Sequence, residues 1–516
     1  MLKNLLAVYA RHIKGLSCSS RVINFSFAKH KAKPFLIQPD ENRSLTFQEL
    51  ETLTEKAVLL LAEKGIGEAE VAAFSASNCI DYFIIRAACH IRGVIFFGLP
   101  PTLTQEQTIH FLTVSKAKIF FYQNRDDAAI EEIKAKAQVK YLVELNTGFH
   151  STTTDEAKPR KTRLSLVTDG NQCATFNLSS ATTSKTPKII RLSDTNWIES
   201  LYGYIRNATL KTAQRNVFFC SVPLLTAGST TFLPCLLSGF SCLVVKETIA
   251  IEHVVSYSIQ YNVTRLYITP SRLLELLEWC KIHNQHFSAL ESIVTGTERI
   301  PTLRLKEAID YFGPIISVGY GMAEALPPIS LLSPGVYHKL GSVGKIAKGV
   351  KIKITDEGRI AIKSKTVSMG YLDNPTETSQ HFKDGWFYSD DYGYIDKDKY
   401  LYIFGRKEEI LTESPRRIFA KEAEDKLYTL AFINRCAVLS RNAQMYIFAS
   451  LREAIGNDQA KNAIQKIFDE NFKNILALKK IIIKEALPIN AFGKLDRRRL
   501  EEEITIACAT ETLFTF

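Results

Sequence analysis

The chain has 516 residues, more than one hydrophobic core of ordinary size can organise, so we expect at least two domains. Its content of 46% hydrophobic and 23% charged residues excludes an intrinsically disordered or fibrous protein. The formal net charge of +11 is modest for this length, and the basic residues are scattered along the chain. They form no nucleic-acid-binding motif, so a generally basic surface or an anionic small ligand explains the charge.

The ten cysteines and ten histidines show neither the spacing of a metal site nor that of a disulfide framework. Most cysteines lie in apolar surroundings, which predicts buried, reduced thiols and a cytoplasmic protein. The most apolar stretch, residues 217–245, is interrupted by Pro223, Gly228, Pro234 and Gly239. Because a membrane-spanning helix needs about 20 uninterrupted apolar residues, we expect a buried strand, a loop and a buried helix there, and no transmembrane segment.

Residues 1–39 contain lysines and arginines but no acidic residue. In a helix, the apolar residues of this segment would share one face. Three interpretations stay open: a mitochondrial transit peptide, a basic amphipathic helix on a membrane, and a helix docked on the surface of the domain. The apolar residues that would share this helical face are Leu2, Leu5, Leu6, Tyr9, Ile13 and Leu16.

Helix and strand patterns alternate from Lys33 onward. Thr46 and Glu49 have the spacing of a capping box at the start of a helix that Gly65 ends, and Gly93 ends the next helix. This alternation predicts a parallel α/β sheet, and the polar residues 146–163 predict a surface loop. We expect strands at 33–37, 71–77 and 118–123, a strand leading to a proline turn within 96–104, and helices at 45–66, 79–94 and 104–117.

A cluster of hydroxyl side chains lies in FNLSSATTSKTPKIIRLSD, residues 176–194, directly after a predicted strand. Hydroxyls, backbone N–H groups and an ammonium such as that of Lys188 are the groups that hold a polyphosphate. A solvated loop has the same composition, so residue chemistry alone leaves both interpretations open.

The segment GWFYSDDYGYIDKDKYLYIFGRKEEIL, residues 385–411, joins aromatic strand patterns to a charged turn. A carboxylate at Asp391 can accept both hydroxyls of a ribose, and the guanidinium of Arg406 can bind a phosphate through two hydrogen bonds. Further along, LPINAFGKLDRRRL at 487–500 has Lys494 after a glycine and before a basic helix start. Adjacent carboxylates and a lone lysine are also ordinary surface charges.

In order and spacing, these motifs resemble those of the adenylate-forming, or AMP-binding, superfamily of acyl- and aryl-CoA ligases, luciferases and peptide-synthetase adenylation domains. The resemblance extends from Lys33 to Leu500. It implies an α/β fold with a large multi-layer N-terminal adenylating domain at 1–405 and a hinge at 406–409. A small mobile α+β domain would follow at 410–516.

The hydroxyl cluster resembles the phosphate loop of that superfamily. Two early glycines of the family pattern are replaced here by Ala181 and Ser184. Glycine lets the backbone approach phosphates at little steric cost, so we expect a stiffer loop. The residues that the resemblance assigns to nucleotide binding in this loop are Ser180, Thr182, Thr183 and Lys188.

Residues 318–328, VGYGMAEALPP, resemble the Tyr-Gly-x-Thr-Glu motif of the family, with Ala323 in place of the threonine. The resemblance implies that Tyr320 and Gly321 pack near the adenine and that Glu324 holds Mg²⁺, a hard cation that prefers carboxylate oxygen. The alternative is a tight turn between a strand and a loop, with Glu324 merely exposed. The segment 292–301 resembles the strand and turn that contact the adenine, and its loop residues are Gly296, Thr297 and Glu298.

The remaining assignments also come from the resemblance. Asp391 matches the ribose-binding aspartate, Arg406 an arginine near the hinge, and Glu408 the hinge residue itself. Lys494 matches a lysine that bridges the acid and the α-phosphate, and that leaves the site when the small domain rotates. Thr226 occupies the place of a substrate-pocket histidine, so this pocket departs from the family pattern.

The implied activity is that of an acid–thiol ligase. A carboxylic acid and Mg²⁺-bound ATP would give an acyl-adenylate and pyrophosphate, and the acyl group would pass to CoA or to a carrier-protein phosphopantetheine. The segment 413–417 lacks the glycine that lines the pantetheine tunnel in the family, so the resemblance supports adenylation more fully than thiol transfer. Two alternatives stay open: an adenylating enzyme that loads an acyl- or peptidyl-carrier protein, and a catalytically degenerate homologue that binds a ligand or a protein. The sequence does not identify the acid.

Overall fold

The computed structural model of this protein describes residues 16–145, 170–179, 187–207, 216–414, 416–442, 444–452, 455–489 and 494–513. The predicted loop at 146–163, the amphipathic pattern before Leu16 and the loop residues Ser180, Thr182 and Thr183 lie outside these ranges. Among the described residues, every helix is too short or too polar to span a bilayer.

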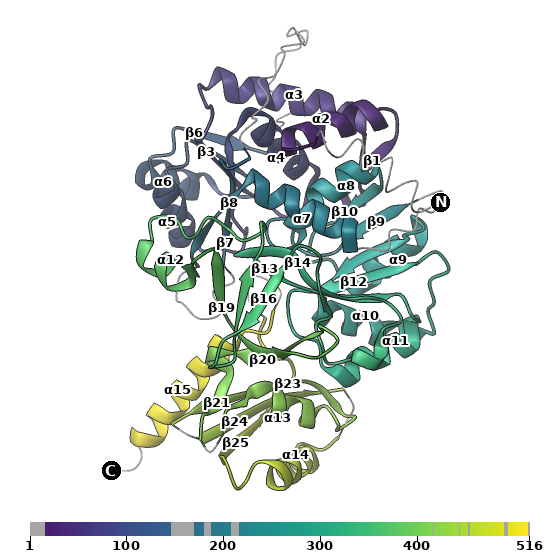
Figure 1. The fold of residues 1–516 in the computed structure, drawn as a ribbon, viewed down its shortest axis with the longest axis vertical. Helices are drawn as coiled ribbons and strands as arrows, with labels where there is room; N and C mark the ends of the chain where they lie inside the picture. The colour runs from purple at the N-terminus through teal and green to yellow at the C-terminus, as the bar shows by residue number, and fades with distance from the viewer. Residues whose placement is uncertain are drawn as a thin grey trace.

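Two large, mostly parallel sheets form the upper part of the molecule in Figure 1. One sheet has the strand order β6-β5-β3-β4-β7-β8, and only its edge strand β8 is antiparallel to its neighbour. Its strands are β3 (Val71–Ser75), β4 (Ile95–Gly98), β5 (Ile119–Tyr122), β6 (Tyr141–Glu144), β7 (Cys173–Leu178) and β8 (Ile189–Ser193).

The second sheet has the order β15-β14-β13-β12-β11-β9-β10-β1-β2, with a parallel centre and antiparallel strands at both ends. Its strands are β1 (Pro34–Gln38), β2 (Arg43–Thr46), β9 (Val217–Cys220), β10 (Ser241–Val244), β11 (Arg265–Ile268), β12 (Ser292–Gly296), β13 (Ile316–Met322), β14 (Ala325–Leu332) and β15 (Lys345–Ile346).

Helices pack on both sheets, and α4 joins their cores. Tyr82 of α4 contacts Phe74 of the first sheet, with ring centroids 6.3 Å apart, and Phe83 contacts Phe35 of the second sheet at 5.8 Å. The helices of this part are α2 (Ser19–His30), α3 (Phe47–Glu63), α4 (Ile80–Arg92), α5 (Gln105–Ser115), α6 (Asp127–Ala137), α7 (Asp194–Asn207), α8 (Phe232–Ser238), α9 (Ile251–Gln260), α10 (Pro270–His283), α11 (Thr302–Phe312) and α12 (Pro375–His381).

The local signals read from the sequence are confirmed in this region. The backbone N–H of Glu49 donates to Thr46 Oγ1 at 3.2 Å, and the Glu49 carboxylate accepts from the Thr46 N–H at 2.7 Å, which is the predicted capping box. Gly93 ends α4 in the left-handed region at φ 72°. The apolar stretch 217–245 forms β9, a 3₁₀ turn, α8 and β10, as its proline and glycine breaks predicted.

A third, five-stranded sheet lies below, and its inner face carries Ile360, Ile362 and Phe387 in a separate buried cluster. The strands are β16 (Lys351–Ile354), β17 (Arg359–Lys363), β18 (Phe382–Lys383), β19 (Trp386–Ile395) and β20 (Leu401–Arg406). The predicted hinge at 406–409 falls at the end of β20 and on a single 3₁₀ turn, Lys407–Glu409.

The segment after this turn forms the small body at the bottom of Figure 1, with its own buried cores. Three strands in the order β23-β24-β25 carry α13 and α14 against them, while α15 extends toward the C-terminus. The elements are β21 (Ile410–Thr412), β22 (Ile418–Phe419), α13 (Ala420–Leu427), β23 (Ile433–Arg441), β24 (Gln444–Leu451), α14 (Asn457–Asn471), β25 (Ala477–Ile483) and α15 (Arg497–Leu513).

Candidate functional site

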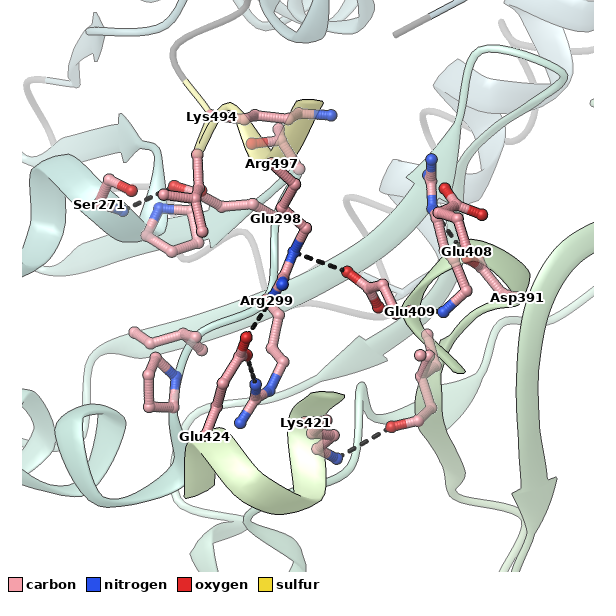
Figure 2. Close-up of a pocket in the computed structure, with 18 of the residues that line it drawn as sticks. Ser271, Glu298, Arg299, Asp391, Glu408, Glu409, Lys421, Glu424, Lys494 and Arg497 are labelled. Atoms are coloured by element: carbon pink, nitrogen blue, oxygen red, sulfur yellow. Dashed lines mark hydrogen bonds and ion pairs between the residues drawn. The ribbon is translucent and has the colours of Figure 1, made fainter. Parts of the chain in front are cut away.

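A cavity of about 700 Å³ lies where the small body meets the two sheets above it. Its walls come from segments far apart in the sequence: the loop after β12, the end of β13, the β19–β20 hairpin, α13 and the segment that begins α15. Figure 2 shows charged side chains from these segments turned toward one another. Eight of the residues singled out in the sequence line it: Thr297, Glu298, Tyr320, Gly321, Asp391, Arg406, Glu408 and Lys494.

Asp391 is a buried, oriented carboxylate in this cavity. The β19–β20 ladder pairs Asp391 directly with Arg406, and Arg406 Nε lies 3.1 Å from Asp391 Oδ1. The Tyr320 hydroxyl donates to Asp391 Oδ2 at 2.6 Å. Its neighbour Asp390 is bound to Arg359 at 3.2 Å and does not line the cavity. Strand alternation therefore separates two carboxylates that are adjacent in the sequence.

The loop after β12 is shaped by a close approach between strands. A Cβ on Gly296 would lie 2.5 Å from the Gly319 carbonyl oxygen on β13, so only glycine fits there. Thr297 follows in the left-handed region at φ 79°, and its buried Oγ1 has no hydrogen-bond partner among the described residues. Glu298 accepts from the Ser271 N–H at 2.8 Å, at the start of α10. A buried hydroxyl without a partner at the cavity wall is a contact that a polar ligand can make.

The motif at 318–328 forms a hairpin, because β13 continues to Met322 and β14 begins at Ala325. The tight turn of the alternative interpretation is therefore present, but a strand and not a loop follows it, and Glu324 is only partly exposed. Glu324 sits in the turn and accepts from the Tyr371 hydroxyl at 3.2 Å, and desolvation raises the pKa of this carboxyl. A Cβ on Gly321 would lie 2.6 Å from Pro327 Cβ, so the hairpin requires glycine there.

Lys188 and Glu324 lie beside the cavity wall rather than in it. The Lys188 ammonium forms an ion pair with Glu377 of α12 and lies 4.9 Å from the Tyr371 ring. Tyr371 thus contacts both Lys188, predicted to bind phosphate, and Glu324, predicted to hold Mg²⁺. Neither Tyr371 nor Glu377 was found from the sequence. Glu377 is brought here by the position of α12, and Tyr371 by the pairing of its segment with Ile190 of β8.

Lys494 is in the cavity, although it lies nearly 90 residues after the hinge in the sequence. Desolvation and the nearby Arg406 lower the pKa of its ammonium to about 8, against the opposing effect of Glu298, Asp391 and Glu324. Burial likewise raises the pKa of Glu408 to about 6. At neutral pH, Lys494 therefore keeps its positive charge within a group of carboxylates.

Thr226 is not brought to this cavity. It precedes the 3₁₀ turn Ala227–Thr231, and its Oγ1 lies 3.4 Å from the Pro223 carbonyl oxygen. Among the described residues, Thr226 is not part of the cavity wall that the nucleotide motifs form.

The donors present fit a magnesium nucleotide. Within the described residues, no three His, Cys, Asp or Glu side chains form a cluster that would hold a metal alone. Mg²⁺ is typically held by one or two carboxylates together with substrate phosphates. Glu324 offers such a carboxylate, and the nearby Lys188 offers an ammonium that can bind the phosphates.

Comparison with known proteins identifies the chain as an adenylate-forming enzyme. The family model described as AMP-binding enzyme matches residues 24–372, so the chain belongs to the AMP-binding enzyme family. The 2-succinylbenzoate–CoA ligase of Listeria monocytogenes is 24% identical over 470 residues, which cover 90% of this chain and 95% of that protein. The medium/long-chain-fatty-acid–CoA ligase FadD8 of Mycobacterium tuberculosis is 27% identical over 303 residues, covering 54% and 53% of the two chains.

Solved structures confirm the predicted fold class. The anthranilate CoA ligase AuaEII in complex with anthranoyl-AMP superposes with a TM-score of 0.85 at 21% identity, covering 95% of this chain and 98% of that one. The o-succinylbenzoate CoA synthetase MenE of Bacillus subtilis, with its acyl-adenylate OSB-AMP, gives a TM-score of 0.80 at 20% identity and covers 93% and 97%. The predicted superfamily and enzyme class, that of acid–thiol ligases, are therefore confirmed.

Proposed function

We propose that this protein activates a carboxylic acid with Mg²⁺-bound ATP to an acyl-adenylate, and then transfers the acyl group to a thiol. The observation that carries this proposal is the convergence of Asp391, Arg406 and Lys494 on one cavity from a strand, a hinge and a segment near α15. These groups match the three parts of an adenylation reaction: a ribose, a phosphate and a developing charge between acid and phosphate.

Each side chain has a role that its surroundings support. Asp391, oriented by Tyr320 and Arg406, accepts hydrogen bonds from the ribose hydroxyls, and the loop at 296–298 borders the base. Lys494 supplies positive charge as the acid oxygen attacks the α-phosphorus and pyrophosphate departs. Little covalent chemistry falls to the protein in such a transfer, so positioning and electrostatics dominate catalysis.

Glu324 is the residue that we assign to Mg²⁺, with Tyr371 holding its carboxylate in place. The metal neutralises phosphate charge when bound. Lys188 joins this group once its ion pair with Glu377 is exchanged for phosphate oxygens. Ser180, Thr182 and Thr183 complete the phosphate loop in this proposal.

The acceptor thiol is CoA in the simplest form of the proposal, because the relatives are named CoA ligases. A carrier-protein phosphopantetheine is the alternative acceptor. We also propose a reducing, cytoplasmic location, since the described cysteines are free thiols and all but Cys173 are buried.

The deciding experiment is acid-dependent exchange of labelled pyrophosphate into ATP, screened over aryl, fatty and amino acids. Exchange with one acid class would establish adenylation and name the substrate class. Free CoA and a pantetheinylated carrier protein, compared as acceptors with that acid, would then identify the thiol.

A second candidate function is that of a degenerate homologue that binds a ligand or a protein without catalysis. It is motivated by the replaced glycines at Ala181 and Ser184, by Ala323, and by the Lys188–Glu377 ion pair that occupies a phosphate-side lysine. Absence of exchange with every acid class, together with retained ATP binding, would favour this function over the first.

A further inference from the structure

A buried carboxylate outside the predicted motifs connects the two bodies of the molecule. Glu424 of α13 is only 4% exposed. Its Oε2 lies 2.8 Å from Arg299 Nη1, in the loop that follows β12 of the large body. Its Oε1 forms an ion pair with Arg497 and accepts the Val438 N–H at 3.0 Å. Figure 2 shows Glu424 between the two arginines.

Arg497 lies three positions after Lys494 and begins α15. Its guanidinium has three partners among the described residues. It forms an ion pair with Glu424, its Nε lies 3.3 Å from the Glu409 carboxylate, and its Nη1 donates to the Val438 carbonyl oxygen at 3.1 Å. Three anchors on one planar group fix the position of the short segment from Lys494 to Arg497.

The hinge joins the same network. Glu409 Oε2 accepts the Arg406 backbone N–H at 3.0 Å, and Arg406 in turn contacts Asp391. Arg299 directly follows Glu298, one of the carboxylates that face Lys494, and it also forms an ion pair with Asp425. The network therefore runs from the cavity wall of the large body, through Glu424, to the segment that carries Lys494.

Electrostatics keep Glu424 charged in this place. Burial alone would raise the pKa of its carboxyl, but Arg497 and Arg299 outweigh burial, so the pKa lies below its usual value. Removing one member of a buried, hydrogen-bonded ion cluster leaves the others desolvated and uncompensated, which is far more disruptive than losing a surface pair.

We infer that Glu424 is a positioning residue for the adenylation step: by binding Arg299 and Arg497 together, it holds Lys494 in the cavity. The role in adenylation rests on the proposed function, whereas the placement of Lys494 by Glu424 does not. Glu424 itself does not touch the reacting atoms in this inference. It acts through the segment at 494–497, and only in the arrangement of the two bodies that brings Arg299 within reach.

Two substitutions test this. Glu424→Gln keeps shape and removes charge, while Arg299→Met removes the large-body partner and leaves the small body intact. Asp310→Asn, which breaks an exposed pair with Lys306 within α11, is the matched control. We expect acid-dependent pyrophosphate exchange to fall about 100-fold in both test variants, the scale of a misplaced catalytic group, and to be unchanged in the control.

The half-reactions separate positioning from general damage. Conversion of a chemically prepared acyl-adenylate and CoA to thioester is expected to stay within about threefold of wild type, because this step does not use Lys494. Equal loss in both half-reactions would overturn the inference. Arg299→Met provides the test if Glu424→Gln fails to fold, because the Arg299 side chain is 30% exposed and the buried Glu424 keeps Arg497 as its partner.

A readout independent of activity follows Lys494 itself. Pulse acetylation across pH, quantified by mass spectrometry at this lysine, should give a midpoint near 8 in wild type. In the test variants the midpoint should rise toward the ordinary lysine value of about 10.4, because the ammonium leaves the desolvated site. An unchanged midpoint in a folded variant would overturn the inference. If wild type shows no exchange with any acid, the proposed function fails, while this titration still decides the role of Glu424.

Discussion

Asp390 and Asp391 carry the same charge, but their surroundings give them different tasks. Asp390 forms an ion pair with Arg359 away from the cavity, whereas Asp391 is buried beside Tyr320 and Arg406. A carboxylate that is already oriented loses little freedom on binding a ribose, so its hydrogen bonds contribute more fully to affinity.

Replacing Asp391 should weaken ATP binding. Loss of a charged hydrogen-bond acceptor is worth about 1.5–3 kcal/mol, so we expect Asp391→Ala to reduce ATP affinity by roughly one to two orders of magnitude. Isothermal titration calorimetry with ATP measures this. Asp390→Ala is the neighbouring control and should keep its affinity. Equal affinity in folded Asp391→Ala and wild type would remove Asp391 from the nucleotide site.

Replacing Lys494 should affect one half-reaction. Removing a single transition-state donor costs about two to three orders of magnitude in rate, so we expect a loss of this size in pyrophosphate exchange by Lys494→Ala. ATP affinity and thioester formation from prepared acyl-adenylate should change much less. The exposed pair Lys466–Glu470 offers the control Lys466→Ala. Exchange at the wild-type rate in Lys494→Ala would assign the charge to another residue.

The same lysine predicts a pH dependence. Its pKa is lowered to about 8, and a lysine carries positive charge only below its pKa. We therefore expect the exchange rate of wild type to fall as pH rises through about 8, rather than near the usual lysine value. Exchange rates measured from pH 6.5 to about 9.5 test this. A rate that stays level to the upper limit, or a decline that persists in Lys494→Ala, contradicts the assignment.

At the scale of elements, the site depends on how closely β12 and β13 approach. A Cβ added at Gly296 would lie 2.5 Å from the backbone of β13. A Cβ added at Gly319, its partner on β13, would lie 3.9 Å from the nearest atom, which is an ordinary contact. This close approach sets the distance between the loop at 297–298 and Tyr320. Backbone cannot move aside as a side-chain tip can, so the two glycines should respond differently to the same added methyl group.

Gly296→Ala should therefore separate the strands and destabilise the protein. Overpacking costs about 1–3 kcal/mol in the free energy of unfolding, and we expect that range together with weaker ATP binding. Gly319→Ala is the matched control for stability and should change the unfolding free energy by less than about 1 kcal/mol. Urea denaturation of both variants measures the difference. An equal change in the free energy of unfolding for the two variants would contradict a special role of the close contact at Gly296.

At the scale of the whole molecule, two ion clusters join the bodies. One is the Glu424 network. In the other, Arg452 of the small body lies 3.2 Å from Glu278 and 3.5 Å from Glu307, which also hold the buried Arg304. Both clusters consist of ion pairs that water can replace, which suits domains that move relative to one another.

We predict that residues 1–405 and 410–516 behave as separate rigid bodies. Limited proteolysis should cut first near 406–416, where a single 3₁₀ turn and a short hairpin connect them. Arg452→Ala should speed this cleavage by loosening the second cluster. Mass spectrometry of the first fragments decides the matter. First cuts elsewhere, with this segment protected in both proteins, would indicate one continuous body.

Much of this protein is determined by local sequence. Thr46 and Glu49 form their capping box, Gly93 ends its helix, and the breaks at Pro223 and Gly239 divide an apolar stretch as predicted. These signals succeed because caps, turns and side-chain periodicity depend on residues within a few positions of one another. The order of the nucleotide motifs was also readable, because each motif is short and continuous.

Only the tertiary structure decided which charges work together. It turns the face of β19 that carries Asp391 toward the cavity, keeps Thr226 out of the cavity, and adds Tyr371 and Glu424, which stand in no recognisable motif. These relations join residues from different sheets and from both bodies, so their spacing along the chain carries no information about them. The local sequence determines the elements and their motifs, while long-range packing determines the electrostatic environment in which those motifs act.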